Sequence, residues 1–227
     1  MIDVHYARSP NGMKLPLFLE ELAEQGVLLE HHLVPVRLSA GEQFRAEFLA
    51  ISPNNKIPAI VDHAPLGGGA PLALFESGAI LQYLAEKSGK LLAFDARTRF
   101  ETLQWLTWQV AGLGPMAGQS GWFRKHAAQR DDYAMARYTR ETHRLYGVLD
   151  RRLEGRDFIA GNALSIADIA CWPWIVSHAG HGVSLDDFPD VARWFAAIGA
   201  RPATQRAFAD YEDPYAHPKF TLEEAVA

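Results

Sequence analysis

The order of strand and helix patterns is the feature that most restricts the fold of this chain. Short apolar runs rich in β-branched residues alternate with amphipathic segments over about the first ninety residues. The order β-α-β-α-β-β-α predicts a compact α/β domain with a mixed sheet. The predicted strands are Ile2–Tyr6, Leu28–Val36, Ile57–Val61 and Leu72–Phe75, and the predicted helices are Lys14–Gln25, Gln43–Leu49 and one that opens at Glu76-Ser77-Gly78.

The pattern changes after Ser88-Gly89-Lys90, and every later segment is typical of a helix. We therefore predict an α/β domain over residues 1–88, a linker over 89–96 and an all-helical domain over 97–227. The first of these helices is interrupted at Gly112–Pro115, where glycine and proline predict a kink or a break. The predicted helices are Arg97–Ala111, Asp132–Leu153, Ser165–Ser177, Pro189–Ile198 and Pro202–Phe208.

Composition excludes several classes of protein. The 227 residues carry a net charge of −5, which gives no reason to expect a nucleic-acid partner. No apolar run approaches the roughly 18–20 residues of a membrane span, and the first residues lack the features of a signal peptide, so we expect a cytoplasmic protein. The single cysteine, Cys171, excludes an internal disulfide and a cysteine-rich metal site. The nine histidines show no paired metal-ligand spacing, so no metal is expected.

The stretch Ser52–Asp62 joins a turn to a buried strand. Ser-Pro-Asn-Asn is turn chemistry, and the apolar run that begins at Ile57 after Lys56 predicts the strand. Pro58 stands at the head of this strand, where a missing N–H is tolerated. The peptide before it keeps an N–H and a C=O that can pair with an extended ligand, and an Ile-Pro bond is one at which a cis peptide costs little.

Two further turns carry donors at the start of a predicted helix. Glu76 and Ser77 can hold the ammonium and the carboxylate of an amino acid, because a helix N-terminus favours anions. Ser9 and Asn11, in a turn over residues 7–12, can donate hydrogen bonds to a thiolate. For each motif taken alone, an ordinary helix cap is the favoured interpretation.

Two other features have structural and functional interpretations. Ser165 with Asp168 predicts a capping box before an apolar helix, and Cys171 in that helix is interpreted as a buried, inert thiol. The second feature is a series of arginines at helical spacing, of which Arg137 is the strongest candidate to reach an anionic ligand, across a subunit interface or within one chain. A solvated charged face is the alternative for the whole series.

Taken together, the strand and helix order, the Ile-Pro at the third strand, the Glu-Ser at the third helix and the helical second half resemble the glutathione transferase superfamily. The resemblance covers nearly the whole chain and is strongest to bacterial nu-class members, which are glutathione-dependent disulfide-bond oxidoreductases. The matching segments are Phe18–Glu21, Ser52–His63, Leu74–Leu81, Gly112–Met116 and Ser165–Trp174.

This resemblance implies a thioredoxin-like first domain with a cis Pro58, an all-α second domain and a homodimer. It implies that glutathione is held by Gln43, Lys56, Ile57, Pro58, Glu76, Ser77 and Arg137. Within this set the Ile57 backbone pairs with the cysteinyl part, Glu76 and Ser77 hold the γ-glutamyl end, and Arg137 reaches into the neighbouring subunit. Asn11 matches the family's active-site asparagine, whereas Ser9 stands where a threonine is expected. Residues 120–126 also depart from the pattern.

The expected function is a glutathione-dependent disulfide-bond oxidoreductase. Because the chain lacks a plausible active-site cysteine, the attacking sulfur is expected to belong to bound glutathione, with Asn11 and Ser9 as the catalytic residues. The expected partners are a small-molecule disulfide or electrophile and a second copy of the chain. Two alternatives stay open, namely conjugation of glutathione to electrophiles and a glutathione-binding regulatory protein without turnover.

Overall fold

The chain forms two compact units in the computed structural model, which describes residues 1–222. The first unit comprises residues 1–99 together with residues 200–211, and the second comprises residues 100–199 together with residues 212–222. The predicted linker, residues 89–96, therefore lies within the first unit.

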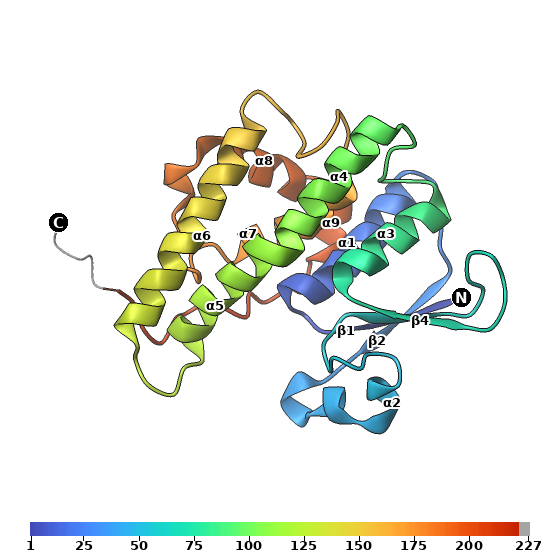
Figure 1. The fold of residues 1–227 in the computed structure, drawn as a ribbon, viewed down its shortest axis with the longest axis horizontal. Coiled ribbons are helices and arrows are strands. Elements are labelled where there is room, and N and C mark those ends of the chain that lie inside the picture. The colour runs from blue at the N-terminus through green and yellow to red at the C-terminus, as the bar shows by residue number, and fades with distance from the viewer. Residues whose placement is uncertain (223–227) are drawn as a thin grey trace. The chain divides into compact units, whose positions relative to one another are not determined.

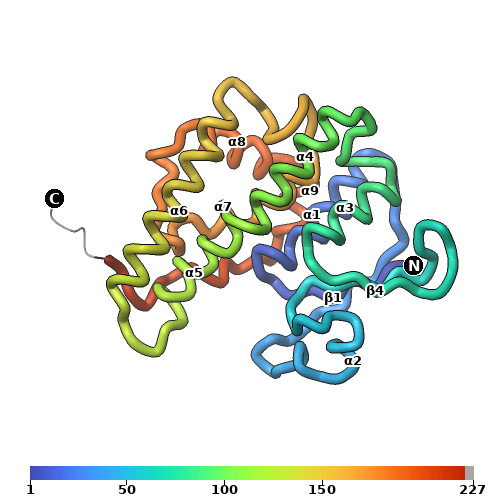
Figure 2. The backbone as a smooth tube through the Cα atoms, in the orientation of Figure 1, coloured from blue at the N-terminus to red at the C-terminus, as the bar shows by residue number. Residues whose placement is uncertain are grey.

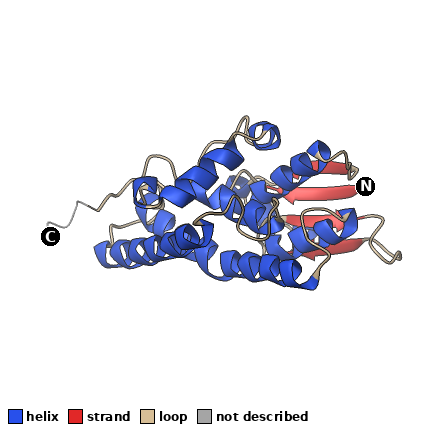
Figure 3. Cartoon of the chain, turned by 90° about the horizontal axis from the view of Figure 1, so that it is seen from above, coloured by secondary structure: helices blue, strands red, loops and turns tan. Residues whose placement is uncertain are grey.

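A four-stranded mixed sheet forms the centre of the first unit. Its order is β2-β1-β3-β4, with β1 parallel to β2 and β3 antiparallel to both β1 and β4. All strands formed by residues 1–222 belong to this sheet, which Figure 3 shows in red. The predicted mixed sheet is confirmed, although β2 is shorter than the predicted strand. The strands are β1 (Ile2–Tyr6), β2 (His31–Pro35), β3 (Ala59–Asp62) and β4 (Leu72–Phe75).

Two helices, α1 (Pro10–Glu24) and α3 (Ser77–Ser88), lie on one side of this sheet, and the short α2 (Ala46–Leu49) lies on the other (Figure 1). Side chains from the sheet and the two long helices fill the core between them. Two short 3-10 helices, Leu38–Ala40 and Glu42–Phe44, precede α2. The fully buried core residues include Val4, Leu15, Phe18, Ile60, Ile80, Leu81 and Leu84.

Helix α1 begins four residues earlier than the sequence pattern indicated. Residues 7–12 were predicted to be a turn, but Pro10 is the first residue of the helix and Ser9 is its N-cap. Proline suits the first helical position because the N–H it lacks has no partner there in any helix. The turn signal of Ser-Pro-Asn-Gly is thus a helix start.

Helix α9 (Pro202–Ala207) returns to the first unit and packs against α1. Arg201 makes two parallel hydrogen bonds of 2.6 Å to Glu21, whose side chain is fully buried in α1. Arg206 donates to Glu20 at 2.7 Å and to Glu24 at 2.5 Å. A buried carboxylate needs such a partner, because an unpaired buried charge is costly.

The second unit is helical within the residues described. Helices α5 and α6 pack side by side, and Figure 2 traces both paths. The predicted break after α4 is a π-helical turn, Gln109–Leu113, that leads directly into α5. The helices are α4 (Ala96–Trp108, whose first turn belongs to the first unit), α5 (Gly114–Lys125), α6 (Asp132–Leu153), α7 (Ile166–Val176) and α8 (Pro189–Gly199), with a short 3-10 helix at Leu185–Asp187.

Asp168 organises the core of the second unit, and the predicted capping box is confirmed. Its fully buried carboxylate accepts hydrogen bonds from the Ser165 N–H at 3.0 Å and hydroxyl at 2.9 Å, from the Ile159 N–H at 2.9 Å and from Trp194 Nε1 at 3.0 Å. Burial raises the pKa of this carboxyl, which the hydrogen bonds oppose.

We expect Asp168→Ala to lower the free energy of unfolding by about 3 kcal/mol or more, because it strands several buried donors at once. Ser165→Ala is the matched control, and it should cost only about 1 kcal/mol because it removes a single cap. Urea unfolding followed by tryptophan fluorescence measures both. Equal, small losses in the two variants would contradict the central place of Asp168.

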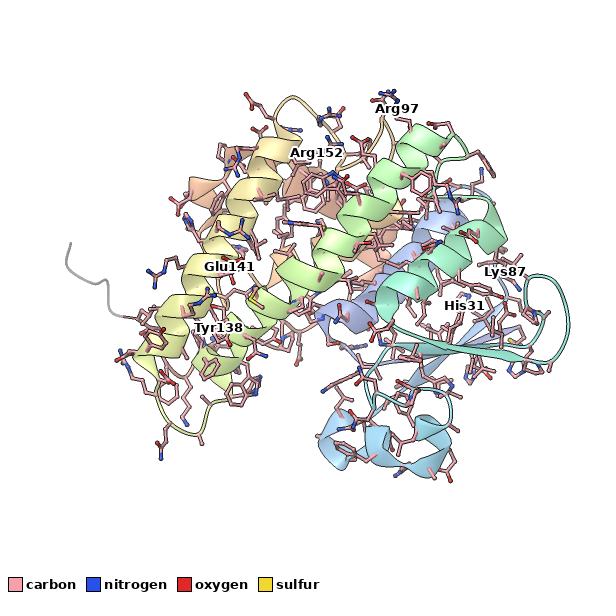
Figure 4. All side chains as sticks on the ribbon, viewed as in Figure 1. His31, Lys87, Arg97, Tyr138, Glu141 and Arg152 are labelled. Atoms are coloured by element: carbon pink, nitrogen blue, oxygen red, sulfur yellow. The ribbon has the colours of Figure 1, made fainter. Side chains whose placement is uncertain are left out.

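A second buried carboxylate predicts how stability depends on pH. Asp62, at the end of β3, accepts from Lys87 at 2.6 Å and from the Tyr83 hydroxyl at 2.7 Å; Figure 4 labels Lys87. Burial raises the pKa of Asp62, but hydrogen bonds from Lys87, Tyr83 and the Ala64 N–H outweigh it, so this pKa lies below its ordinary value of 3.8.

The folded state therefore binds this proton less readily than the unfolded chain does. The stability contributed by Asp62 is present above the ordinary pKa and is lost as the pH falls through the folded pKa. We expect the difference in unfolding free energy between wild type and Asp62→Asn to be largest above about pH 4 and to shrink below it. Denaturation at a series of pH values tests this, and a difference that stays constant contradicts it.

Candidate functional site

The sheet register brings three turns of the first unit to one edge. Ala59, the first residue of β3, pairs with His5 on one side and with Phe75 on the other. Because β3 runs opposite to β1 and β4, its start lies beside their ends. The turn into α1, the turn into β3 and the start of α3 therefore meet at this end of the strands. We call this end of the sheet the ligand edge.

The turn into α1 leaves a hydroxyl hydrogen available. Ser9 Oγ accepts the Gly12 N–H at 3.3 Å, which caps the helix as predicted. An oxygen that accepts this bond keeps its own hydrogen for another partner. The close approach of this turn requires glycine, since a Cβ on Gly12 would lie 2.0 Å from the Ala7 carbonyl oxygen. Asn11 is half-buried in the first turn of the same helix.

The turn into β3 is held by a buried serine. Ser52 is fully buried, and its hydroxyl donates to the Lys56 carbonyl at 2.8 Å. Asn55 donates from its backbone to the Ser52 carbonyl at 2.9 Å and adopts a positive φ of 50°. The Ile57-Pro58 bond is cis, as the resemblance implied.

The side chain of Ile57 packs into the protein, whereas its backbone N–H and C=O are not used in the sheet. The side chain packs against a cluster formed by Val36, Phe48 and Ala59. Its own N–H and C=O make no backbone hydrogen bond to any residue between 1 and 222. Buried backbone groups are nearly always paired, so this peptide is suited to an extended ligand that lies along the edge.

The start of α3 differs from an ordinary helix cap. Glu76 occupies the N-cap position with a φ of 71°, and its side chain makes no capping hydrogen bond. Ser77 is the first helical residue and is almost completely buried. Uncapped N–H groups at a helix start carry positive potential and favour an anion. Because Glu76 is exposed, its carboxylate can meet a cation in solution.

Lys14 is a residue of this edge that the sequence analysis did not identify. The sequence predicts only that a helix begins at Lys14, whereas the structure shows this side chain fully buried in α1 with its Nζ 3.1 Å from Ser77 Oγ. The available signal was its place between apolar residues, since Met13 and Leu15 flank it.

The remaining predicted residues are more widely spread. Gln43 lies in the 3-10 helix before α2, and its Oε1 is buried with no partner among residues 1–222. Lys56 is exposed in the turn before Ile57. Arg137 is exposed on α6, in the second unit. Cys171 is fully buried in α7, as predicted.

Burial also affects a histidine near the edge. His5, at the penultimate position of β1, packs edge-on against Phe48 with ring centroids 6.3 Å apart. Burial lowers the pKa of His5, which favours a neutral imidazole.

Within residues 1–222, no cluster of three acidic, histidine or cysteine side chains is arranged to hold a metal ion. In the same range, we find no helix with the length and apolar character that a membrane span needs.

Comparison with family models identifies both halves of the chain. Residues 4–86 match the model described as "Glutathione S-transferase, N-terminal domain", and residues 114–202 match "Glutathione S-transferase, C-terminal domain". Together these two matches cover most of the sequence.

Individual proteins agree with these matches. The chain is 55% identical over 207 residues to the Escherichia coli "Disulfide-bond oxidoreductase YfcG", which covers 91% of this chain and 94% of that protein. It also resembles a crystal structure of a glutathione transferase family member from Pseudomonas fluorescens with two glutathiones bound, with a TM-score of 0.85, 46% identity and 91% coverage of both chains. A glutathione transferase from Pseudomonas putida, with one glutathione disulfide bound per subunit, gives a TM-score of 0.85 at 43% identity, with 93% of this chain and 92% of that chain covered.

We expect Gly12→Ala to lower the free energy of unfolding by about 1–3 kcal/mol, because the added methyl group collides with the Ala7 carbonyl. Gly147→Ala, within α6, is the matched control. Its Cβ would meet no atom closer than 3.5 Å, so it should be neutral or stabilising by up to about 1 kcal/mol. Urea unfolding compares the two, and a stable Gly12→Ala variant would contradict the tight turn.

Proposed function

Because the chain belongs to the glutathione S-transferase family, we propose that it binds glutathione at the ligand edge and uses the thiolate of that glutathione to reduce disulfides. The observation that carries the proposal is the convergence of three unsatisfied features in one unit. These are the open backbone of Ile57, the uncapped start of α3 and the available hydroxyl hydrogen of Ser9. A γ-linked tripeptide has an amino-acid end, a peptide backbone and a thiol to match them.

In this proposal each part of glutathione meets a different element. The γ-glutamyl carboxylate receives hydrogen bonds from Ser77 and the first N–H groups of α3, and its ammonium faces Glu76. The cysteinyl backbone pairs with Ile57 beside Pro58. The glycyl end extends toward Gln43 and Lys56, whose ammonium suits a carboxylate.

The sulfur then faces the start of α1. A free thiol has a pKa of about 8.5, and helix N-termini and hydrogen-bond donors lower it. We assign this role to the Ser9 hydroxyl and to Asn11, which sit in the N-cap and the first turn. They favour the thiolate, which is the reactive form of the nucleophile.

The proposed reaction needs no protein thiol. The glutathione thiolate attacks one sulfur of a disulfide, forms a mixed disulfide and releases the other sulfur as a thiolate that takes up a proton. A second glutathione thiolate attacks the glutathione sulfur of the mixed disulfide. This step releases the second substrate thiol and leaves glutathione disulfide, so two glutathiones supply the two electrons.

Two observations support this scheme. The only cysteine of the chain, Cys171, is fully buried, so a substrate disulfide has no exposed protein thiol to meet. The related structures from the two Pseudomonas species contain two glutathiones in one case and glutathione disulfide in the other. These molecules are the reductant and the oxidised product of the proposed reaction.

We further propose that the protein works as a cytoplasmic homodimer in which Arg137 reaches the partner's glutathione. Arg137 is exposed on α6 and forms no salt bridge within residues 1–222, which leaves its guanidinium available to an anion. Conjugation of glutathione to an electrophile is the second candidate, because related solved structures are named glutathione transferases and the thiolate is the same.

We expect Asn11→Ala to lower turnover of a small disulfide by glutathione by roughly tenfold or more, because it removes a preorganised donor at the thiolate. The assay presents a panel of small disulfides and a panel of electrophiles to the same enzyme. Faster turnover of disulfides supports the proposal, and turnover of electrophiles alone supports conjugation instead. Unchanged turnover and an unchanged pH profile in Asn11→Ala contradict the role given to Asn11.

Cys171→Ser is the matched control for the source of the sulfur. A folded Cys171→Ser variant should keep its full activity, since the thiol lies inside α7. Loss of activity in this variant, with its circular dichroism and melting temperature retained, refutes the use of a glutathione-borne sulfur alone.

A further inference from the structure

Arg124 is an unusual residue for the interior of the second unit. It lies on α5 and is only 6% exposed, yet it forms no salt bridge with any residue between 1 and 222. Arginine is almost never buried unless its charge is paired, because an uncompensated buried charge is costly. Burial lowers the pKa of this guanidinium, and no acidic group among the described residues opposes that effect.

The hydroxyl groups beside Arg124 carry no compensating charge. Ser120 Oγ donates its only hydrogen to the His181 carbonyl at 2.7 Å, so it is the acceptor in its 3.1 Å contact with Thr139 Oγ1. Thr139 Oγ1 accepts in turn from Arg124 Nη2 at 3.1 Å, across the two helices that lie side by side in Figure 1. This chain of hydrogen bonds runs from the guanidinium to a backbone carbonyl, and every member after the guanidinium is neutral.

Two buried N–H donors remain without an acceptor. Arg124 Nε is buried and has no partner among residues 1–222, and the same holds for both ring nitrogens of His181. Burial, together with the positive charges of His178 and Arg124, lowers the pKa of His181 to about 3, so its ring is neutral. A neutral imidazole carries a hydrogen on one of its nitrogens. A charged donor and a neutral donor therefore both need an acceptor.

The backbone holds the guanidinium next to this histidine. Gly182, the residue after His181, has a φ of 76°, and a Cβ on it would lie 2.2 Å from Arg124 Nη2 and 2.7 Å from Nε. Only glycine combines this backbone conformation with so close an approach. The guanidinium thus lies flat against the chain beside His181, which places the two unpaired groups in one neighbourhood.

The C-terminal segment encloses the same neighbourhood. The Tyr215 ring lies 5.1 Å from the His181 ring, centroid to centroid, and a Cβ on Gly121 would lie 2.4 Å from the tyrosine ring. The Phe220 N–H donates to the Arg124 carbonyl at 2.8 Å. An acceptor that is enclosed in this way has to be small.

We propose that Arg124 and His181 bind a small monovalent anion, of the size of chloride, inside the second unit. One negative charge compensates the guanidinium, and a spherical anion accepts from both N–H groups without a hydrogen of its own. The site belongs to the second unit, whereas the ligand edge belongs to the first, and the inference does not depend on the proposed function. Because the anion joins α5 to the segment that contains His181, its binding stabilises the folded second unit.

A buried water molecule is the competing explanation. Water can accept from Arg124 Nε and donate to His181, and buried waters commonly satisfy such groups. It leaves the positive charge of the guanidinium uncompensated, however. The two occupants differ in one measurable respect, since only an anion site responds to the concentration of a halide.

The experiment measures the melting temperature of the full chain in sodium chloride, sodium bromide and sodium gluconate at equal ionic strength. Equal ionic strength keeps the screening of surface charges constant, and gluconate is too large for an enclosed site. Both halides should raise the melting temperature of the wild type by about 3–6 °C over gluconate at about ten times their dissociation constant. Crystals soaked in sodium bromide should show an anomalous scattering peak within hydrogen-bonding distance of Arg124 Nε.

Two variants should lose this response. Arg124→Met removes the charge at similar length and should abolish both the difference between halide and gluconate and the bromide peak. His181→Phe keeps a ring without a donor and should weaken halide binding about tenfold, because a hydrogen bond to a charged group is lost. Arg140→Met is the matched control, since it removes an exposed arginine of α6 in the same unit and should keep the full halide response.

Three results overturn the inference. One is a wild type that melts at the same temperature in halide and in gluconate, with water beside Arg124 in the soaked crystals. Another is an undiminished halide response in Arg124→Met, which places the effect elsewhere. The third is a bromide peak without any response in solution, which indicates an adventitious ion only. If Arg124→Met does not fold, chloride NMR of the wild type replaces it. The chloride line must then broaden with protein and sharpen on addition of bromide but not of gluconate, and any other behaviour refutes the site.

Discussion

The pairing of β3 between β1 and β4 is the constraint from which the ligand edge follows. Ala59 is opposite both His5 and Phe75, so the strand that starts at the edge is flanked by two strands that end there. Each of those two strands continues into a helix, and both helices therefore begin at the same edge. Pro58 has no N–H to extend the ladder, which leaves the Ile57 peptide unpaired between the two helix starts.

This arrangement concentrates positive potential in one place. Two helix N-termini and the ammonium of Lys14 lie near the edge, and each of them favours negative charge nearby. Glu76 adds backbone strain, since a φ of 71° is rare for a residue with a side chain. In the proposed function, the carboxylates of a bound glutathione compensate this positive potential. Binding should consequently stabilise the first unit as a whole.

The local signals predicted local structure well. Alternating and β-branched runs identified all four strands, and Ser165 with Asp168 identified the capping box because its partners are three residues apart. The start of α1 was missed because Ser9-Pro10 carries the same signal in a turn and in a helix start. For the start of α3 the sequence left two interpretations open, an ordinary cap and an anion-binding helix start, because only the backbone shows which residue is the N-cap.

Features that depend on distant contacts could not be read from the sequence. The burial of Lys14 arises when α1 packs against α3, where Ser77 lies 63 residues further along the chain. The return of residues 200–211 to the first unit depends on Arg201 meeting Glu21, a pair separated by 180 residues. No periodicity records either pairing. The open peptide before Pro58 could be predicted from the missing N–H of proline, whereas only the resemblance implied a role for Gln43, because the chemistry of a neutral amide does not reveal one.

A site whose reacting thiol belongs to bound glutathione behaves differently from one built around a protein cysteine. A protein dithiol has its own reduction potential, which the fold tunes, and it can be trapped in an oxidised form. With Cys171 buried, the proposed site has no redox state of its own. The direction of the reaction then follows the ratio of glutathione to its disulfide in the surrounding solution. In this proposal the protein controls only the rate, through the placement and protonation of a sulfur that leaves with the product. Such a site needs hydrogen-bond donors and charge around the ligand, and it needs no thiol of its own.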